Sequence, residues 1–384
     1  MQQSVDRILT THVGSLPRPK DLLDLMKAKV SGAAYDARVR SAVAECVRKQ
    51  VESGIDIVSD GEQSKPGFFT YVRERLEGFE ERPQQKRRMF PDEVAAFPEY
   101  YEKYFREAMM GGAIAPVVPL VCTGPVNYCG EEALALDIAN LKAAAAESRA
   151  LGAFVPAVAP SGVGTNEYYR TEEEFFHTVG RALRTEYKSI VDAGLLLQVD
   201  DPFLCDIFGD SALDAARQCS RAEMYVEAIN QSLRGIPPEK VRYHTCYGIN
   251  EGPRIHEAAL SDVVGYMLKV NAGAYSFEAA NPRHEHEYHL WESVRLPEGK
   301  LLIPGVITHA SNIVEHPVLI AERLVRFAKL VGRENVVAGA DCGFSSQATY
   351  HTEVHPTVVW AKFEAMREGA RLATRQLWSS EAGG

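Results

Sequence analysis

The chain alternates short apolar runs, rich in β-branched residues, with longer stretches in which apolar residues recur at helical spacing. Most of the short runs are apolar throughout rather than alternating, as expected for parallel strands that are buried on both faces. Nine of them predict strands: Ile8–Val13, Ile55–Ser59, Val117–Cys122, Phe154–Ala159, Leu195–Val199, Val241–Thr245, Ala274–Phe277, Leu301–Ile307 and Val336–Ala340.

Long amphipathic stretches separate these runs and predict helices. Several of the stretches end at a glycine, namely Gly54, Gly152, Gly194 or Gly332, which is typical of helix termination. Repeated strand–helix units without a dinucleotide-binding fingerprint favour an α/β fold of the (β/α)8 TIM-barrel type over a doubly wound sheet. Nine candidates compete for eight places, so one must lie outside the barrel or be wrong. The helical stretches include Ala37–Ser53, Glu131–Leu151, Glu172–Ala193, Ala212–Arg234 and Ala321–Val331.

Residues 78–116 interrupt this rhythm. The segment contains the basic run Lys86-Arg87-Arg88 and a cluster of aromatic residues around Tyr100 to Phe105. It predicts a helical insertion, either a helical hairpin packed on the barrel rim or a lid over the active site. The chain has no Ser/Gly-rich linker and no internal repeat, so residues 1–384 are expected to form one barrel domain.

The composition is that of an ordinary soluble enzyme, with 46% hydrophobic and 24% charged residues and a formal charge of −10. No long block of like charge is present, so we expect no nucleic-acid partner. No apolar stretch approaches the roughly 18 residues that span a bilayer, and the N-terminus lacks the features of a signal peptide. The expected location is therefore the cytoplasm, with no membrane partner. The seven cysteines form no CxxC pair, so a functional cysteine should be a metal ligand or a nucleophile.

Polar and ionisable residues follow almost every predicted strand. In a barrel the carboxyl ends of the strands share one face, which is where such enzymes place their active sites. The strand-end segments are His12-Val13-Gly14-Ser15, Asp60-Gly61-Glu62, Asp200-Asp201-Pro202, His244-Thr245-Cys246, Glu278, Thr308-His309 and Asp341-Cys342-Gly343.

Three of these residues suit a metal ion. His244 and Cys246 lie two residues apart on an extended segment, so their side chains point to the same side. An isolated HxC pair is a weak signal, but Cys342 at another strand end completes a His/Cys/Cys set. Three such ligands with a fourth position open are typical of catalytic Zn²⁺. A substrate thiol at the open position would lose its proton near neutral pH and remain nucleophilic.

Seven ordered motifs resemble the catalytic barrel of cobalamin-independent methionine synthase. Together they span most of the chain. They are Thr11-His12-Val13-Gly14-Ser15-Leu16-Pro17, Asp60-Gly61-Glu62, Gln198-Val199-Asp200-Asp201-Pro202, His244-Thr245-Cys246, Phe277-Glu278, Gly305-Val306-Ile307-Thr308-His309 and Asp341-Cys342-Gly343.

The resemblance implies a zinc-dependent transferase that methylates homocysteine to methionine. It implies the zinc ligands His244, Cys246, Glu278 and Cys342, with Glu278 displaced or weakened when the thiol enters. It also implies that His309 assists proton transfer as the alkyl group leaves its donor, work suited to a histidine. The residues implied to hold the amino-acid part of homocysteine are Ser15, Glu62 and Asp200.

Three departures from the family pattern bear on the donor and on His309. The full-length synthase has a second, N-terminal barrel that helps to hold the polyglutamyl folate, whereas this chain has room for one. The donor is therefore open between folate, methylcobalamin, an epoxide and other alkyl compounds. Thr308 stands where the family has aspartate, and His309 comes one residue early, with Ala310 in the histidine's place.

The third departure is the form THVGSLPRP of the first motif, with His12 and Arg18. It resembles a short single-barrel branch that includes epoxyalkane:coenzyme M transferase. An alternative function is therefore epoxide opening by the coenzyme M thiolate, with Arg18, Lys65 or Arg73 as anchor for the sulfonate.

Two further readings stay open. One is a barrel that binds zinc or a small ligand without turnover; His309 and Asp200 beside the ligands speak against it. The other is a uroporphyrinogen-decarboxylase-like barrel, whose chemistry needs basic residues and no metal. The oligomeric state is not predicted by any pattern in the chain.

Overall fold

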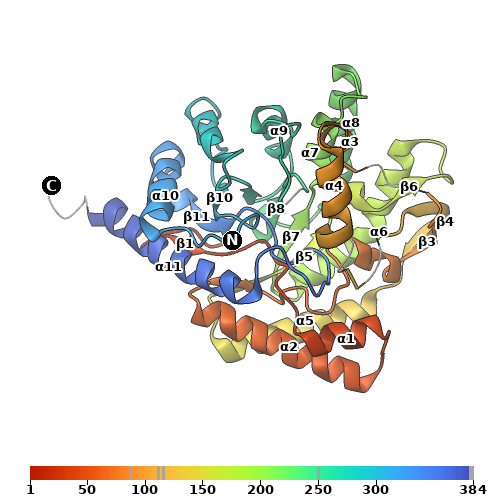
Figure 1. The fold of residues 1–384 in the computed structure, drawn as a ribbon, viewed down its shortest axis with the longest axis horizontal. Helices are drawn as coiled ribbons and strands as arrows, with labels where there is room; N and C mark the ends of the chain where they lie inside the picture. The colour runs from red at the N-terminus through yellow and green to blue at the C-terminus, as the bar shows by residue number, and fades with distance from the viewer. Residues whose placement is uncertain (86–88, 110–112, 115–116, 249–250, 380–384) are drawn as a thin grey trace.

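A computed structural model describes residues 1–85, 89–109, 113–114, 117–248 and 251–379. Its centre is a sheet of eight parallel strands in the order β1-β11-β10-β9-β8-β7-β5-β2 (Figure 1). A parallel bridge between Thr11 and Ile57 joins the first and last strands of this order, so the sheet closes into a barrel. The predicted (β/α)8 barrel is confirmed. The strands are β1 (Leu9–Thr10), β2 (Ile57–Ser59), β5 (Gly152–Val158), β7 (Leu196–Asp200), β8 (Val241–His244), β9 (Ala274–Phe277), β10 (Leu301–Ile307) and β11 (Val337–Ala340).

Helices surround the barrel. In Figure 1, α1, α2 and α5 cover one side, and α10 and α11 flank β1 and β11. Strand β9 is followed by the 3-10 helix Glu285–Glu292 instead of an α-helix. The helices outside the insertion are α1 (Lys20–Lys27), α2 (Ala33–Glu52), α5 (Glu131–Ser148), α6 (Glu172–Asp192), α7 (Phe203–Phe208), α8 (Ala215–Ser232), α9 (Leu260–Met267), α10 (Pro317–Val331) and α11 (Pro356–Trp378).

The prediction that helices end at glycine residues is confirmed at three positions and wrong at one. Gly54, Gly194 and Gly332 follow helices α2, α6 and α10 with φ values of +89°, +87° and +92°, a conformation that glycine adopts at little cost. Gly152 instead begins strand β5. Helix α5 ends earlier, with Arg149 in the left-handed conformation at its C-cap.

One predicted strand lies outside the barrel. The Val117–Cys122 run contributes to β4 (Leu120–Tyr128), which pairs antiparallel with β3 (Leu76–Glu81) and parallel with β6 (Thr165–Asn166) in a separate three-stranded sheet. A barrel that needs eight strands leaves the ninth for this smaller sheet, which explains the surplus candidate.

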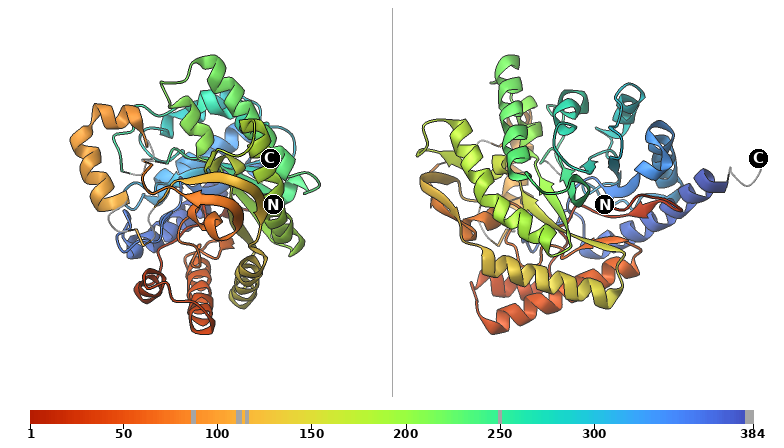
Figure 2. Two further views of the ribbon diagram at one scale, coloured as in Figure 1. Left: turned by 90° about the vertical axis from the view of Figure 1, so that its right-hand side faces the viewer. Right: turned by 180° about the vertical axis from the view of Figure 1, so that it is seen from behind.

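The insertion at 78–116 is only partly helical. It begins within β3, and its helices are the short α3 (Pro91–Ala96) and α4 (Pro98–Tyr104), followed by a single π-helical turn, Phe105–Met109. Figure 2 shows α3 and α4 (orange) to one side of the barrel, apart from the ring of other helices. The basic run at 86–88 lies outside the described residues.

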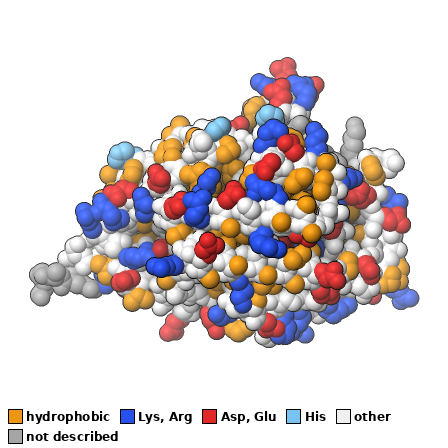
Figure 3. All heavy atoms as spheres, turned by 90° about the horizontal axis from the view of Figure 1, so that it is seen from below, with side chains coloured by type: hydrophobic (Ala, Val, Ile, Leu, Met, Phe, Trp, Pro, Cys, Tyr) orange, Lys and Arg blue, Asp and Glu red, His pale blue; other side chains and the backbone are white. Residues whose placement is uncertain are grey.

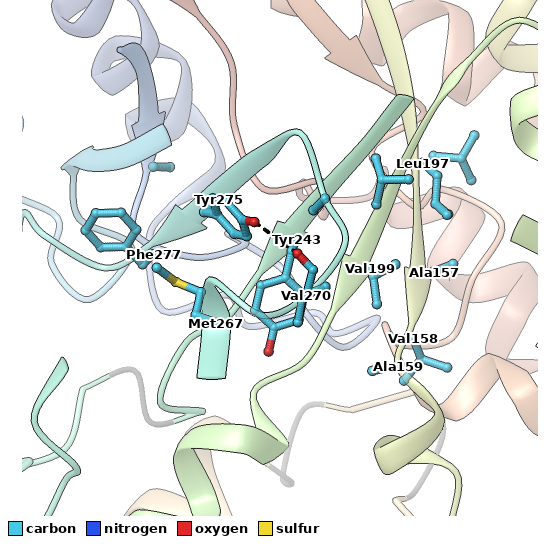
Figure 4. Close-up of a cluster of buried hydrophobic side chains, with 14 of the residues drawn as sticks. Ala157, Val158, Ala159, Leu197, Val199, Tyr243, Met267, Val270, Tyr275 and Phe277 are labelled. Atoms are coloured by element: carbon cyan, nitrogen blue, oxygen red, sulfur yellow. Dashed lines mark hydrogen bonds between the residues drawn. The ribbon is translucent and has the colours of Figure 1, made fainter. Parts of the chain in front are cut away.

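The core lies between the barrel strands and the helices. Tyr243 and Tyr275, on neighbouring strands, lie beside Met267 and Val270 from the outer layer (Figure 4), and the hydroxyl of Tyr275 donates to the carbonyl of Val270 at 2.9 Å. Both tyrosines are fully buried. A buried phenol with a partner retains its apolar contacts without leaving a polar atom unsatisfied.

The surface carries charges of both signs. On the face in Figure 3, Lys and Arg side chains are interspersed with Asp and Glu, and no broad area of one sign is visible. None of the helices in the described parts of the chain has the length and apolar content needed to cross a membrane.

Candidate metal centre and substrate pocket

Strands β8 and β11 bring three soft ligands together. The ligand atoms of His244, Cys246 and Cys342 all lie within 4.8 Å of one another. His244 is the last residue of β8, Cys246 follows two residues later, and Cys342 comes two residues after the end of β11. All three side chains are buried. The two segments are about 100 residues apart in the chain, and the barrel brings them together at one of its ends.

The atoms of this cluster fit a bound metal ion. The Nδ1 atom of His244 lies 3.3 Å from the hydroxyl of Ser276, while its Nε2 atom is buried without a hydrogen-bond partner among the described residues. A buried ring nitrogen without a partner is costly unless it meets a ligand. An imidazole held at one nitrogen and free at the other is the arrangement that metal sites use.

The thiol of Cys246 also resists ionisation on its own. Hydrogen bonding with Cys342, together with burial, raises the pKa of Cys246 well above its usual range. Two neighbouring buried thiolates repel each other in a poorly solvated site. A divalent cation removes this penalty because it stabilises coordinating thiolates, so the pair indicates a metal rather than a free thiol nucleophile.

Glu278 lies next to this cluster but does not belong to it. Its carboxylate forms a neighbouring group with His309 and Asp341, whose ligand atoms lie within 4.8 Å of one another. Its Oε1 atom accepts from the backbone N–H of Tyr247 at 3.2 Å. Its Oε2 atom accepts from Arg254 at 2.6 Å and from Asn281 at 2.9 Å.

Asp341 ties the two ligand-bearing strand ends together. Its Oδ1 atom accepts from the backbone N–H groups of Ala279 and Ala280, both at 2.8 Å, and its Oδ2 atom accepts from the Asn281 side chain at 3.1 Å. The turn after β9 is thereby fixed to the residue that precedes Cys342. This gives the aspartate of the Asp-Cys-Gly motif a structural role.

Ser15 lies against the end of β11. A Cβ atom on Gly343 would come within 2.0 Å of the Ser15 hydroxyl, and the backbone N–H of Phe344 donates to the Ser15 carbonyl at 3.0 Å. Only a glycine at 343 leaves room for this approach. The first and last predicted motifs are therefore in direct contact beside the metal cluster.

The Asp-Gly-Glu motif forms a tight turn that aims Glu62 inward. Asp60 accepts from the backbone N–H of Glu62 at 2.9 Å, and both Gly61 and Glu62 adopt left-handed conformations, with φ of +67° and +55°. Such a backbone is strained for glutamate, and strain of this kind is concentrated at functional sites. The Oε2 atom of Glu62 is buried without a partner among the described residues, and burial raises the pKa of Glu62 to about 7.

Asp200 supplies a second buried carboxylate from β7. The side-chain amide of Gln198 donates to its Oδ1 atom at 2.7 Å and also to the carbonyl of Val13. Burial, and then the nearby charge of Glu62, raise the pKa of Asp200 well above its usual range. The charge of Lys65 offsets part of both shifts, but none of the described residues that line the pocket is Lys or Arg, so a ligand ammonium would bring positive charge into the pocket itself.

His309 reaches the same space although it comes one residue earlier than in the family motif. Thr308 donates its backbone N–H to Glu315 at 2.7 Å, and its hydroxyl accepts from Ala310 at 3.1 Å. This turn directs His309 into the pocket. Burial, followed by the charge of Arg254, lowers the pKa of His309 to about 3, so the imidazole is neutral at physiological pH.

A pocket with a cavity volume of about 160 Å³ unites these groups. Its lining combines polar residues from the strand ends with aromatic side chains, among them Phe90 from the insertion. Among the described residues that line it, none is Lys or Arg. Of the eight predicted site residues, seven line this pocket: Ser15, Glu62, Asp200, His244, Cys246, His309 and Cys342. Phe68, Phe69, Phe203 and Phe344 complete the aromatic wall.

The three candidate sulfonate anchors do not line this pocket. Arg18 is buried and donates to the carbonyls of Glu62, Ser345 and Lys65 at 2.9–3.1 Å. Lys65 donates to the Pro156 carbonyl at 2.5 Å. Arg73 pairs with Glu81 at 3.0 Å. Each cation is engaged in holding the fold, so the expectation that one of them anchors a sulfonate finds no support in the pocket.

Sequence reasoning missed two contributors. Phe90 belongs to the insertion, for which the sequence left open a rim hairpin or a lid. Phe90 lines the pocket, so the insertion contributes to the site. Arg254 was not singled out because no motif marks it, yet it forms a 2.6 Å ion pair with Glu278. No local pattern signals a contact between a loop arginine and a strand-end glutamate.

The comparisons agree with the ordered motifs. The family model "Cobalamin-independent synthase, Catalytic domain" matches residues 8–89, the segment with Ser15 and Glu62. A methionine synthase of Sulfolobus acidocaldarius is 27% identical over 256 residues, which cover 65% of this chain and 64% of that relative, slightly less than two thirds of its length. A methionine synthase of Saccharolobus solfataricus is 22% identical over 386 residues, covering 96% of this chain and 95% of the relative.

Solved structures show the same fold. A B12-independent methionine synthase from Shewanella sp. W3-18-1, in complex with selenomethionine, has a TM-score of 0.71 at 19% identity, covering 97% of this chain and 99% of the other. A putative vitamin-B12-independent methionine synthase from Listeria monocytogenes has a TM-score of 0.65 at 18% identity, with the same coverage. The predicted resemblance to the cobalamin-independent methionine synthase family is confirmed.

Proposed function

Because the chain is similar to the cobalamin-independent methionine synthase family, we propose that it is a zinc-dependent transferase that methylates the thiol of homocysteine. One observation carries the proposal. The ligand atoms of His244, Cys246 and Cys342 converge within 4.8 Å, and the same pocket holds Ser15, Glu62 and Asp200. A metal-ligand set and an amino-acid site in one cavity suit an amino acid that carries a thiol.

The donor set favours zinc over other metals. His244, Cys246 and Cys342 would hold the ion, and Glu278 would be the fourth ligand in the resting enzyme. Imidazole and thiolate ligands with one weak or open position are typical of catalytic zinc. When bound, zinc lowers the pKa of a coordinating thiol and keeps its sulfur available as a nucleophile.

Glu62 and Asp200 would bind the ammonium group of homocysteine. Both carboxylates are buried, and one oxygen of Glu62 has no partner among the described residues. An ammonium group brings charge to both carboxylates and a hydrogen-bond donor to the Glu62 oxygen that lacks one, whereas Asp200 already accepts from Gln198. The region of Ser15 and Gly343 would face the carboxylate end, because hydroxyl and backbone N–H groups are the donors there.

The aromatic part of the pocket lining would receive the methyl donor. The rings of Phe68 and Phe203 lie 6.5 Å apart in a stacked arrangement, and Phe90 adds a further apolar surface from the insertion. These side chains exclude water from the path between donor and thiol, which protects a nucleophilic sulfur. His309 lies on the same pocket and would accept or relay a proton there as a neutral imidazole.

The lining of the pocket favours homocysteine over coenzyme M. Coenzyme M carries a sulfonate, whose recognition calls for Arg or Lys. The described lining residues include neither, and the carboxylates of Glu62 and Asp200 belong to the lining instead. Carboxylates repel a sulfonate and attract an ammonium group.

A thiol competition tests the proposal. The purified protein is loaded with zinc, and zinc–sulfur coordination is read by X-ray absorption with homocysteine or coenzyme M added separately. We expect homocysteine to increase the sulfur ligands from two to three, as the family site would, with coenzyme M inert at the same concentration. A site that takes up coenzyme M and ignores homocysteine contradicts the substrate, and a protein that binds no zinc contradicts the metal centre.

A further inference from the structure

Glu278 is held by three donors that belong neither to the metal cluster nor to the pocket. Its side chain is fully buried, and its Oε2 atom lies 2.6 Å from Arg254 Nη2 and 2.9 Å from Asn281 Nδ2. The backbone N–H of Tyr247, the residue after Cys246, donates to its other oxygen. The carboxylate is thus oriented beside the ligand cluster, and one of its two oxygens is paired with a guanidinium.

Arg254 is unusually placed for a surface-loop arginine. It is 3% exposed, and its backbone is left-handed, with φ of +61°. Its Nε atom donates to Glu257 at 2.6 Å, and its Nη1 atom is buried without a partner among the described residues. A strained, buried arginine with an unused donor persists only where its surroundings fix it, and such strain often marks function.

The insertion fixes this arginine in place. Glu93 of helix α3 accepts from the backbone N–H of Arg254 at 3.2 Å and from that of His256 at 2.7 Å. The hydroxyl of Tyr101, from α4, also donates to Glu93. The segment that places Phe90 in the pocket wall therefore also holds the loop that carries Arg254.

Alternating charges extend the network away from Glu278. Glu257 accepts from His284 at 3.0 Å as well as from Arg254, and the other ring nitrogen of His284 lies 2.8 Å from Glu287. The His284 ring stacks on Tyr247 with centroids 3.9 Å apart. Because each buried charge has an opposite partner, the guanidinium is held rigidly and cannot follow Glu278 if that side chain moves.

We propose that Arg254 is a positioning residue that keeps Glu278 exchangeable at the metal centre, so that a substrate thiol can take its place. This inference rests on the proposed function. A carboxylate that shares its charge with a guanidinium is a weaker ligand than a free one, because partners of a metal ligand tune its donor strength. The arginine thus holds Glu278 within reach of the ion without letting it bind tightly.

Charge balance supports the same role for Arg254 once Glu278 has been displaced from the ion. A substrate thiolate beside Cys246 and Cys342 leaves the centre with an excess of negative charge. A displaced Glu278 would then be a buried anion next to that centre, a costly arrangement when it is unpaired. Arg254 supplies the counter-charge for the displaced carboxylate and so lowers the cost of exchange.

The first test measures thiol entry in the cobalt(II)-substituted protein. Cobalt reports sulfur ligation by its visible absorption, and homocysteine is titrated into wild type and Arg254→Met. We expect the half-saturating homocysteine concentration to rise by about 10-fold in the variant, the scale on which partners of metal ligands act. Arg254→Lys retains the charge and should recover most of the loss. An unchanged titration in a folded, metal-loaded Arg254→Met protein overturns the inference.

The second test does not depend on the thiol. Competition with a chelator should show that Arg254→Met holds cobalt at least as tightly as wild type, because Glu278 is no longer shared. A variant that loses the metal contradicts the inference, since Arg254 would then be needed to hold the ion. Arg75→Met is the matched control: Arg75 is also buried, directly precedes β3, and forms a 2.6 Å ion pair with Asp137 of α5 instead of with a residue of the cluster. It should change stability without changing either titration.

A double substitution separates the two proposals. Glu278→Gln removes the ligand whose release Arg254 is inferred to assist, so adding Arg254→Met to it should have no further effect on thiol entry. Additive effects overturn the inference. If wild-type protein binds cobalt but homocysteine adds no sulfur ligand, the proposed substrate fails, while the chelator comparison still decides the role of Arg254.

Discussion

The hydroxyl of Ser15 occupies the space in which any residue other than glycine at 343 would carry its Cβ atom, at a distance of 2.0 Å. This contact joins the first motif of the chain to the last one. Ser15 lies in the loop that follows β1, and Gly343 directly follows the predicted ligand Cys342. The proposed amino-acid site and the proposed metal centre therefore share one contact.

Substitution of Gly343 should damage substrate binding more than metal binding. Gly343→Ala forces Ser15 away, because a side-chain oxygen at 2.0 Å cannot remain in place. We expect KM for homocysteine to rise by about 10-fold or more, on the scale of one or two lost hydrogen bonds, with the zinc content unchanged. Ser15→Ala combined with Gly343→Ala should relieve the clash but not restore binding. Recovery of wild-type KM in the double variant would contradict a binding role for Ser15.

Cys342→Ser should abolish stable metal binding, since a hydroxyl is a poor substitute for a thiolate ligand. Metal analysis should find about one zinc per chain in wild type and far less in the variant. Cys205→Ser is a matched control: that thiol is also buried, and its sulfur lies 3.2 Å from the hydroxyl of Thr245, beside Cys246 in sequence. It should retain zinc. Equal loss in both variants would show that the effect is general destabilisation.

His309→Gln should slow methyl transfer and leave the metal in place. His309 lines the pocket and groups with Glu278 and Asp341, separately from the His/Cys/Cys cluster. General acid–base assistance contributes about 100-fold or more, so we expect kcat to fall by that order while zinc content stays constant. A variant without zinc would reassign His309 to the metal centre. A variant with normal kcat would remove it from the reaction.

The strands that are buried on both faces could be predicted from the sequence, because they form continuous apolar runs. Strands such as Leu301–Ile307 were predicted with the bounds that the structure has. The Val117–Cys122 run carries the same signature but belongs to the smaller sheet, because an apolar run does not say which sheet will bury it. Helix α11 was missed; it packs on α10 and on β1 at the far end of the chain.

The same distinction between predictable and unpredictable features applies to the candidate site. That the candidate ligands lie together could be predicted, because the barrel brings all strand ends to one face. The partners that tune them were not predictable. Arg254 reaches Glu278 from a loop without a motif, and Arg18 looked like an anion anchor until its donors proved to be occupied by backbone carbonyls. A charge in the sequence does not reveal whether the fold already satisfies it.

The stability of the protein should depend on pH through His12. Burial lowers the pKa of His12 from 6.5 to about 3, and its Nε2 atom lies 2.8 Å from the Gln50 side chain. The folded-state pKa lies below that of the unfolded chain, so the unfolded state binds more protons once the pH falls below 6.5. Stability from the neutral ring is present above that pH and is lost between about 6.5 and 3.

Urea unfolding at pH 7.5 and pH 5 measures this contribution. We expect the difference in unfolding free energy between wild type and His12→Gln to shrink by about 2 kcal/mol at the lower pH. The comparison with the variant matters because buried carboxylates with raised pKa values, such as Glu62, change stability in the opposite direction. A difference that is the same at both pH values would show that His12 is not neutral through burial.

Binding of the amino-acid end should release protons from the pocket. Burial raises the pKa of Glu62 to about 7, and burial with the charge of Glu62 raises that of Asp200. An arriving ammonium group favours the charged carboxylates, so their pKa values fall and protons leave. Affinity should therefore weaken as the pH falls below 7.

Methionine is the suitable ligand for this measurement, because it has the same amino-acid end and no thiol proton to lose. Calorimetry at pH 7 in two buffers of different ionisation enthalpy should give a release of about one proton per bound methionine. Glu62→Gln should lower the release, and Glu62→Gln combined with Asp200→Asn should remove it. Glu353→Gln, which alters a carboxylate bonded to Tyr104 at the rim of the pocket, is the control and should leave it unchanged. Proton uptake by wild type would mean that the carboxylates become neutral when methionine binds. The two carboxylates would then not be the ammonium site.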